Sequence, residues 1–177
     1  MRLLQSDKFN CLIIVVLSLL IISAFVYKEN RYTDGCYGAP LDDTFIHLRF
    51  AQNISRGFGF SYNEGEPQAG STSPIWTILV AGVSLITGEY LLTAKVLSAC
   101  FFILCSFLVY ILSKRLGMSK PYALFTSVLL ILTGRFDWSI LSGIEVTTFT
   151  AMLLAMGIIH INGFYILGNL SSVIWSI

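Results

Sequence analysis

Charged side chains are scarce in this sequence. Only 12% of its 177 residues are charged, whereas 55% are hydrophobic and the mean hydropathy is +0.77. So little polar surface cannot enclose a soluble core, and the apolar residues form long blocks rather than helical stripes. The scarcity excludes an ordinary soluble domain and predicts an all-α, polytopic helical membrane protein.

Concentrated positive charge and paired cysteines are also lacking. The 11 basic residues are spread thinly, and no basic stripe with interleaved aromatic residues occurs, so a nucleic-acid partner is not expected. Three of the four cysteines lie in apolar blocks, which leaves Cys36 without an obvious disulfide partner. We expect four small buried residues rather than a disulfide framework.

The first apolar block covers residues 9–27 and follows two basic residues, Arg2 and Lys8. At ~1.5 Å per residue it is long enough to cross a hydrocarbon core of ~30 Å. A cleavable signal peptide is the alternative, but no small-x-small site precedes Lys28. We therefore predict an uncleaved anchor with its N-terminus in the cytoplasm.

Further spans are predicted at residues 91–112, 122–136 and 146–162. The loop between the first two of these carries only basic charges, Lys114, Arg115 and Lys120, so the positive-inside rule makes it cytoplasmic. After a turn expected near Asn162 and Gly163, residues 164–177 form an incomplete span. The 177 residues are accordingly interpreted as a single transmembrane module that is the N-terminal piece of a longer protein.

A polar outer loop, residues 28–73, separates the first two spans and should lie outside the cytoplasm. Within it, a helix is predicted over residues 42–55, with an apolar side formed by Ile46, Phe50 and Ile54. Residues 74–88 are apolar but short for a crossing, which favours an interfacial helix. Ser73 as N-cap and Pro74 at the first helical position mark its start, and such a terminus can hold a phosphate.

Carboxylates gather on the predicted outer side. Asp42 and Asp43 begin the helix at residues 42–55, and Glu145 returns to the same side at the mouth of the span at 146–162. The simpler interpretation is that the two aspartates cap a surface helix. Acids at the mouth of a span are uncommon, however, and converging carboxylates can serve as a general base or bind a divalent cation.

Four segments in order carry a family resemblance: DDTFIHLRFAQN, GFGFSYNEGEP, GSTSPIW and LSGIE. Together they resemble the GT-C superfamily of polytopic glycosyltransferases, in particular bacterial enzymes related to terminal arabinofuranosyltransferases and, more widely, protein mannosyltransferases. The resemblance covers residues 40–150. The chain departs from the family pattern at Val146, where threonine is usual, at Ala69, where an acid is common, and at His47.

This resemblance implies transfer of a sugar from a polyprenyl-phosphate donor to a glycan or protein acceptor hydroxyl. It implies an active site on the extracytoplasmic face of the cell's inner (plasma) membrane, and usually inversion at the anomeric carbon. A lipid phosphate is already a good leaving group, so the main demand is a base for the acceptor proton. Asp43 is the first candidate for this base and Asp42 the second, and Glu145 is carried over from the family's motif as another acidic site residue.

The donor phosphate requires a cationic or N–H partner. Arg49 matches the basic residue of the family's first motif, and the other candidates lie near outer ends of helices: Lys95, Arg135 and Ser73. Snorkelling to the interface is the alternative for Lys95 and Arg135. A Mg²⁺, Mn²⁺ or Ca²⁺ ion is a further possibility, with Asp42, Asp43 and His47 as the ligands in that case.

Two other functions stay open at this stage. A transporter or channel component would carry its acids deep within the spans, whereas the acids singled out here are predicted at span ends. An inactive, truncated fragment of a glycosyltransferase is the other alternative.

Overall fold

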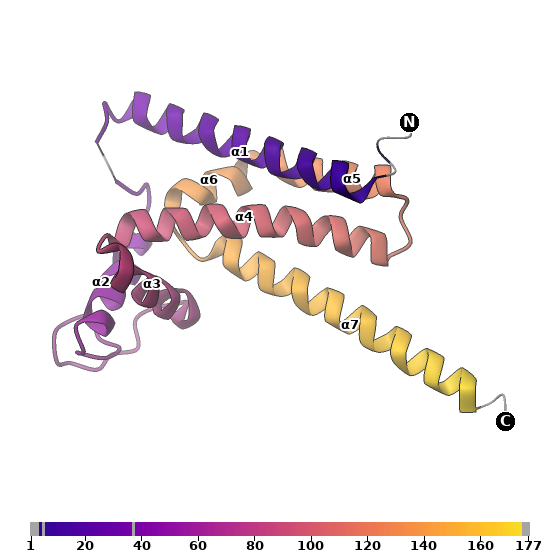
Figure 1. Cartoon of the computed structure of the whole chain (residues 1–177). Helices are drawn as coiled ribbons and strands as arrows, with labels where there is room; N and C mark the ends of the chain where they lie inside the picture. Colours follow the sequence, from indigo (N-terminus) through magenta and orange to yellow (C-terminus); the bar gives the residue numbers. More distant parts are fainter. Residues whose placement is uncertain (1–3, 5, 37, 175–177) are drawn as a thin grey trace.

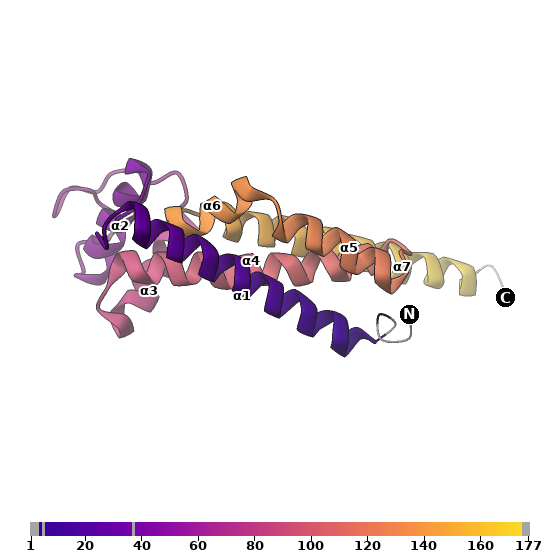
Figure 2. The same ribbon diagram turned by 90° about the horizontal axis from the view of Figure 1, so that it is seen from above.

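The computed structural model describes Leu4, residues 6–36 and residues 38–174, with side chains described up to residue 163. This part of the chain forms seven helices and no strand, as predicted for an all-α protein. In chain order they are α1 (Asp7–Tyr32), α2 (Asp42–Ser55), α3 (Pro74–Thr87), α4 (Tyr90–Arg115), α5 (Lys120–Ile131), α6 (Gly134–Ser142) and α7 (Val146–Ile174). The long helices run lengthwise, and α2 and α3 lie together at one end with the junction of α6 and α7 (Figures 1 and 2). We call this the α2–α3 end.

Three helices are long and apolar enough to cross a membrane by length and composition: α1, α4 and the Val146–Gly163 part of α7. The spans predicted at residues 9–27, 91–112 and 146–162 fall within them. The pair α5 and α6 adds a fourth crossing if the two helices count as one span bent by 55°. The chain therefore has the helices of a membrane protein.

Two predicted boundaries differ from the structure. The span expected at residues 122–136 is broken, because α5 ends at Ile131 and α6 begins at Gly134. Thr133 between them has an extended backbone, its hydroxyl donates to the Leu129 carbonyl at 2.9 Å, and glycine follows, so the helical ladder stops there. The turn expected near Asn162 and Gly163 is wrong, since α7 continues to Ile174. A lone glycine costs a helix only about 1 kcal/mol, too little to force a turn.

The helix α2 coincides with the predicted range but buries a different face. Of the predicted apolar side, only Phe50 is fully buried, and Ile46 and Ile54 are half-buried. The buried residues of α2 are Thr44, His47, Leu48, Phe50, Ala51 and Asn53. Leu48 and Ala51 belong to an apolar cluster with Trp76, Val80 and Ala81 of α3. The helix α2 buries the face that packs against α3, and not the face predicted to lie on a flat membrane surface.

The turn between α6 and α7 is clamped onto the start of α2. Thr44 donates a hydrogen bond to the Ser142 carbonyl at 2.6 Å. Gly143 has a left-handed backbone (φ +65°), and a Cβ atom there would lie 3.4 Å from Ala94 and 3.6 Å from Thr44. Only glycine adopts this conformation without strain in so close an approach. The clamp places Glu145, two residues later, beside α2.

At the opposite end of the bundle, one carboxylate contacts side chains of two other helices. Asp7 at the start of α1 accepts a hydrogen bond from the Tyr110 hydroxyl at 2.7 Å. It also pairs with Lys114 at 2.7 Å and Lys120 at 2.8 Å, which lie at the end of α4 and the start of α5. One acidic residue thus joins α1, α4 and α5.

Candidate functional site

A buried histidine network lies at the α2–α3 end. The side chain of His47 in α2 is 3% exposed, and its Nε2 lies 3.3 Å from Oε2 of Glu145. Its Nδ1 lies 2.9 Å from the Ser71 hydroxyl and 3.3 Å from the Thr77 hydroxyl. The two hydroxyls are 2.7 Å apart. One imidazole therefore joins α2, the loop before α3, α3 itself and the start of α7.

Local structure explains why these four side chains meet. Ser71 precedes the start of α3, where Ser73 is the N-cap residue and proline occupies the first turn. Thr77, one turn into α3, donates to the Ser73 carbonyl at 3.1 Å. Glu145 comes directly before α7, and its carbonyl accepts the first-turn N–H of Phe149 at 2.8 Å. Two helix starts thus face the middle of α2.

Glu145 is held as a carboxylate by this network. The hydrogen bond from His47 lowers the pKa of Glu145 below its usual value, and the residue's own backbone N–H acts in the same direction. Partial burial opposes the shift by raising the pKa but is the weaker effect. A carboxylate that stays ionised in a half-buried position can accept hydrogen bonds or a proton.

An apolar groove opens beside Glu145, with a volume of about 310 Å³. The start of α3 and the carboxylate lie at its polar part, and side chains of α7 line the rest, namely Phe149, Met152, Leu153 and Met156. Two buried polar atoms of lining residues, Nε1 of Trp76 and Oγ1 of Thr148, have no hydrogen-bond partner among the described residues. The groove therefore offers a long apolar surface with a small polar mouth.

Asp42 and Asp43 occupy the first turn of α2, as predicted, and both are exposed. Leu41 is the N-cap residue, and no side chain caps this helix start. Within the described part of the chain, neither carboxylate makes a hydrogen bond or ion pair, and no group of three or more His, Cys, Asp or Glu side chains is placed to hold a metal ion. Asp42, Asp43 and His47 therefore do not form a ligand set, because the network engages both nitrogens of the imidazole.

The Arg49 side chain binds the loop after α2. Its Nε donates to the Tyr62 carbonyl at 3.1 Å, and a terminal nitrogen lies 3.9 Å from Glu64. Asn53 donates to the carbonyls of Ser61 and Tyr62, both at 2.9 Å. Arg49 and Asn53 thus both hold the loop against α2, and the Arg49 side chain stays half-exposed.

The two other predicted phosphate-binding cations lie apart from the network. Lys95 of α4 pairs with Glu29 of α1 at 2.5 Å, and their side chains are 9% and 18% exposed. Its ammonium is therefore committed to a buried ion pair. Arg135 is exposed on the first turn of α6, where it has no described partner. Ser73 lines the groove, and its side chain makes no capping bond, so its hydroxyl is available at the polar mouth.

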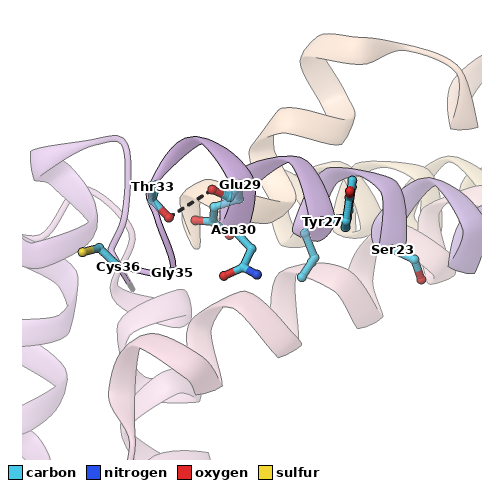
Figure 3. A pocket seen from close by; sticks show the side chains of 8 residues that line it. Ser23, Tyr27, Glu29, Asn30, Thr33, Gly35 and Cys36 are labelled. Atoms are coloured by element: carbon cyan, nitrogen blue, oxygen red, sulfur yellow. Dashed lines mark hydrogen bonds between the residues drawn. The ribbon is translucent and has the colours of Figure 1, made fainter.

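A second hollow of about 350 Å³ lies at the end of α1. Its lining side chains come from the last turns of α1 and the turn that follows, and they include Tyr27, Asn30 and Cys36 (Figure 3). The hydroxyl of Thr33 is turned back onto the Glu29 carbonyl at 3.0 Å. With Glu29 bound to Lys95, this hollow has no unpaired charge on its wall, and we assign it no chemistry.

Sequence reasoning missed three polar residues of interest. Ser71 and Thr77 were not predicted as site residues, although Thr77 is a polar position within an otherwise apolar helix start. Asp137 of α6 is 2% exposed, and its Oδ1 has no hydrogen-bond partner among the described residues. An acid within an apolar segment was the available signal for Asp137.

The α2–α3 end combines the histidine network, the apolar groove and two exposed acids at a helix start. The side chains come from residues 42–77 and 145–156, which lie far apart in the chain. Comparison with models of known protein families, with curated proteins and with solved structures found no match.

Proposed function

We propose that this protein is a GT-C-type membrane glycosyltransferase, which transfers a sugar from a polyprenyl-phosphate donor to an acceptor hydroxyl with inversion. One observation carries the proposal. The segments that resemble this superfamily contact one another at the α2–α3 end: Thr44 bonds to Ser142, and His47 contacts both Ser71 and Glu145. This polar network joins segments about 100 residues apart and, unlike the Asp7 cluster at the other end, it borders an apolar groove.

The groove supports a lipid-linked donor. Its apolar wall along α7 suits a prenyl chain, and its polar mouth lies at the start of α3. The first N–H groups of a helix lack intrahelical partners and point outward, where they can bind a phosphate together with the Ser73 hydroxyl. In this proposal the polar mouth faces the extracytoplasmic side of the membrane.

Asp43 is the proposed base. The acceptor oxygen attacks the anomeric carbon from the side opposite the phosphate, and the bond between that carbon and the phosphate oxygen breaks. The bonding electron pair leaves with the lipid phosphate, and the acceptor proton passes to the Asp43 carboxylate. Exposure and the lack of a described partner leave this carboxylate available for the proton. Asp42, about 100° around the same helix, is the second candidate.

The test is sugar transfer by membranes that contain the protein, from polyprenyl-phosphate sugars to an added acceptor. Asp43→Asn should lower transfer ~10²-fold to 10⁴-fold, as loss of a general base does. Asp34→Asn is the matched control, because Asp34 is exposed in the loop after α1 and has no role in the proposal. Unchanged transfer by Asp43→Asn would move the base to Asp42 or Glu145, and no transfer from any donor by the wild type would refute the proposal.

A transporter or channel component is the second candidate, and Asp137 is the observation in its favour. This carboxylate is buried in the second half of the bent α5–α6 pair and lacks a described partner. Buried acids in membrane segments commonly serve ion or proton paths. Ion flux into liposomes that depends on Asp137, together with no sugar transfer, would favour this function over the first.

A further inference from the structure

The hydrogen atoms of the histidine network can be counted contact by contact. The network has five contacts: His47 to Glu145, His47 to Ser71, His47 to Thr77, Ser71 to Thr77, and Thr77 to the Ser73 carbonyl. The two contacts of Nδ1, to Ser71 and Thr77, share one hydrogen position, so four contacts need a hydrogen of their own. A carboxylate and a carbonyl only accept hydrogen bonds, so both ends of this chain must receive a hydrogen. The ring therefore donates from Nε2 to Glu145, and Thr77 donates to Ser73.

An imidazolium supplies a hydrogen for every contact. With both ring nitrogens protonated, His47 donates to Glu145 and Ser71, Ser71 donates to Thr77, and Thr77 donates to Ser73. A neutral ring has one hydrogen fewer, so one of the four contacts would lose its donor. The contacts thus need one proton more than a neutral ring and a carboxylate hold together, and the lowered pKa of Glu145 places that proton on the ring.

The other charged groups on the packed elements do not take over this pairing. Asp42 and Asp43 are the acids of α2, and they point to solvent. Lys95 is the cation of α4 nearest the clamp, where its side chain would lie 3.7 Å from a Cβ at Gly143, but its ammonium is bound to Glu29 of α1. His47 is therefore the cationic group in contact with Glu145.

We propose that His47 is a positioning residue, which holds Glu145 in one orientation and as an anion so that the carboxylate accepts hydrogen bonds from sugar hydroxyls at the mouth of the groove. This inference rests on the glycosyl transfer proposed above. Hydroxyl groups are the suitable direct ligands of Glu145, because a carboxylate only accepts hydrogen bonds, whereas the phosphate binds to the backbone N–H groups at the start of α3. Ser71 and Thr77 serve the same end by fixing the ring from its other side.

The first test measures the protonation of Glu145 and does not depend on sugar transfer. Dicyclohexylcarbodiimide modifies protonated carboxyl groups in apolar surroundings, so labelling of the Glu145 peptide against pH, read by mass spectrometry, reports its protonation in the intact protein. His47→Ala should raise the labelling midpoint by about 1 pH unit, because the nearby cation is lost. His47→Gln keeps a side-chain N–H, so its labelling midpoint should lie between those of the wild type and His47→Ala. Ser71→Ala is the mildest change and should raise the midpoint by a smaller amount.

The matched control is His160→Ala, which removes the chain's other histidine, on α7 beyond the groove. It should leave the midpoint unchanged. A midpoint that is the same in wild type, His47→Ala and His47→Gln would overturn the proposal whatever the transfer activity. If His47→Ala does not accumulate in membranes, the comparison of wild type with His47→Gln and Ser71→Ala decides the matter.

The second test distinguishes a role of His47 in positioning Glu145 from a role in binding the lipid-linked donor. His47→Ala should lower kcat about 10-fold to 100-fold, in the range seen for residues that orient a site residue, with little change in KM for the donor. His47→Gln should recover part of the loss. A rise in KM for the donor with unchanged kcat would overturn the assignment. Failure of every donor with wild-type protein would refute the glycosyltransferase proposal, while a shifted midpoint would still support the His47–Glu145 pairing.

Discussion

The two ends of the helix bundle use acidic residues in opposite ways. Asp7 at one end is saturated, with a tyrosine hydroxyl and two lysines on its carboxylate at 2.7–2.8 Å. At the α2–α3 end, Glu145 has one side-chain contact, from His47 at 3.3 Å. Asp42 and Asp43 have none among the described residues. A saturated acid can only hold structure together, whereas a partly satisfied one remains able to bind or react.

The same contrast separates the cations. Lys114 and Lys120 fasten α4 and α5 to α1 through Asp7, and Lys95 is buried against Glu29. These lysines are therefore structural in the described chain. For an anionic ligand, the start of α3 with Ser73 and its first backbone N–H groups remains beside a groove of about 310 Å³. The half-exposed Arg49 and the exposed Arg135 also remain.

The largest expected effect compares Asp43→Asn with Asp7→Asn. Asp43→Asn should lower sugar transfer at least ~10²-fold and leave the unfolding temperature in detergent unchanged, because this carboxylate has no described partner. Asp7→Asn should lower the unfolding temperature and leave sugar transfer unchanged, since Tyr110, Lys114 and Lys120 lose their shared acceptor. Transfer assays and thermal unfolding of both variants check the contrast. The contrast between the two ends would be refuted if Asp43→Asn destabilised the protein as much as Asp7→Asn while sugar transfer persisted.

A second prediction concerns the buried pair of Lys95 and Glu29. Glu29→Gln should destabilise the protein by about 3–5 kcal/mol, because the buried Lys95 charge loses its ion pair with Glu29. The double variant Glu29→Gln with Lys95→Met should recover most of this loss, since no unpaired charge remains. Reversible unfolding in detergent measures the difference. If instead Glu29→Gln were neutral and Lys95→Met abolished donor binding, Lys95 would be a phosphate ligand after all.

Much of the helical framework could be predicted from the sequence. Long apolar blocks specify α1 and α4, and the Ser73–Pro74 start and Gly88 end specify α3, because these signals are local. The break at Thr133 and the continuity of α7 through Gly163 could not be predicted. Both depend on small propensity differences that packing decides.

Several residues that the structure places at the α2–α3 end were candidates from the sequence, namely three acids, Ser73 and His47. Asp42, Asp43 and Glu145 stood out as carboxylates at helix and span ends. The contact of His47 with Glu145 depends on the hydrogen bond from Thr44 of α2 to the Ser142 carbonyl, before the turn at Gly143. One sequence contains no signal for such a contact between distant segments. Lys95, predicted as a phosphate ligand, pairs instead with Glu29 of α1.

A third prediction tests how the loop before α3 is held on α2. A Cβ at Gly70 would lie 3.0 Å from Phe50, whose buried ring packs with Phe60 at a centroid distance of 4.9 Å. Gly70→Ala should therefore destabilise the protein by about 1–3 kcal/mol through overpacking. Gly82→Ala, in α3 with nothing within 4 Å of its Cβ, is the matched control and should be neutral or stabilising by up to about 1 kcal/mol. Equal effects of the two changes would show that the loop does not depend on this contact.

The smallest expected effect is a dependence on pH at the α2–α3 end. Because the folded protein holds the pKa of Glu145 below its ordinary value of 4.5, this carboxylate stabilises the fold above about pH 4.5. The contribution disappears as the pH falls through the lowered pKa, and for a partly exposed pair it amounts to about 1 kcal/mol or less. Limited proteolysis of residues 56–73 in membranes should accelerate as the pH falls below 4.5, and Glu145→Gln should remove that acid-dependent increment while starting from a faster rate. If cleavage in Glu145→Gln followed the same pH course as in wild type, the His47–Glu145 contact would not be what holds the loop.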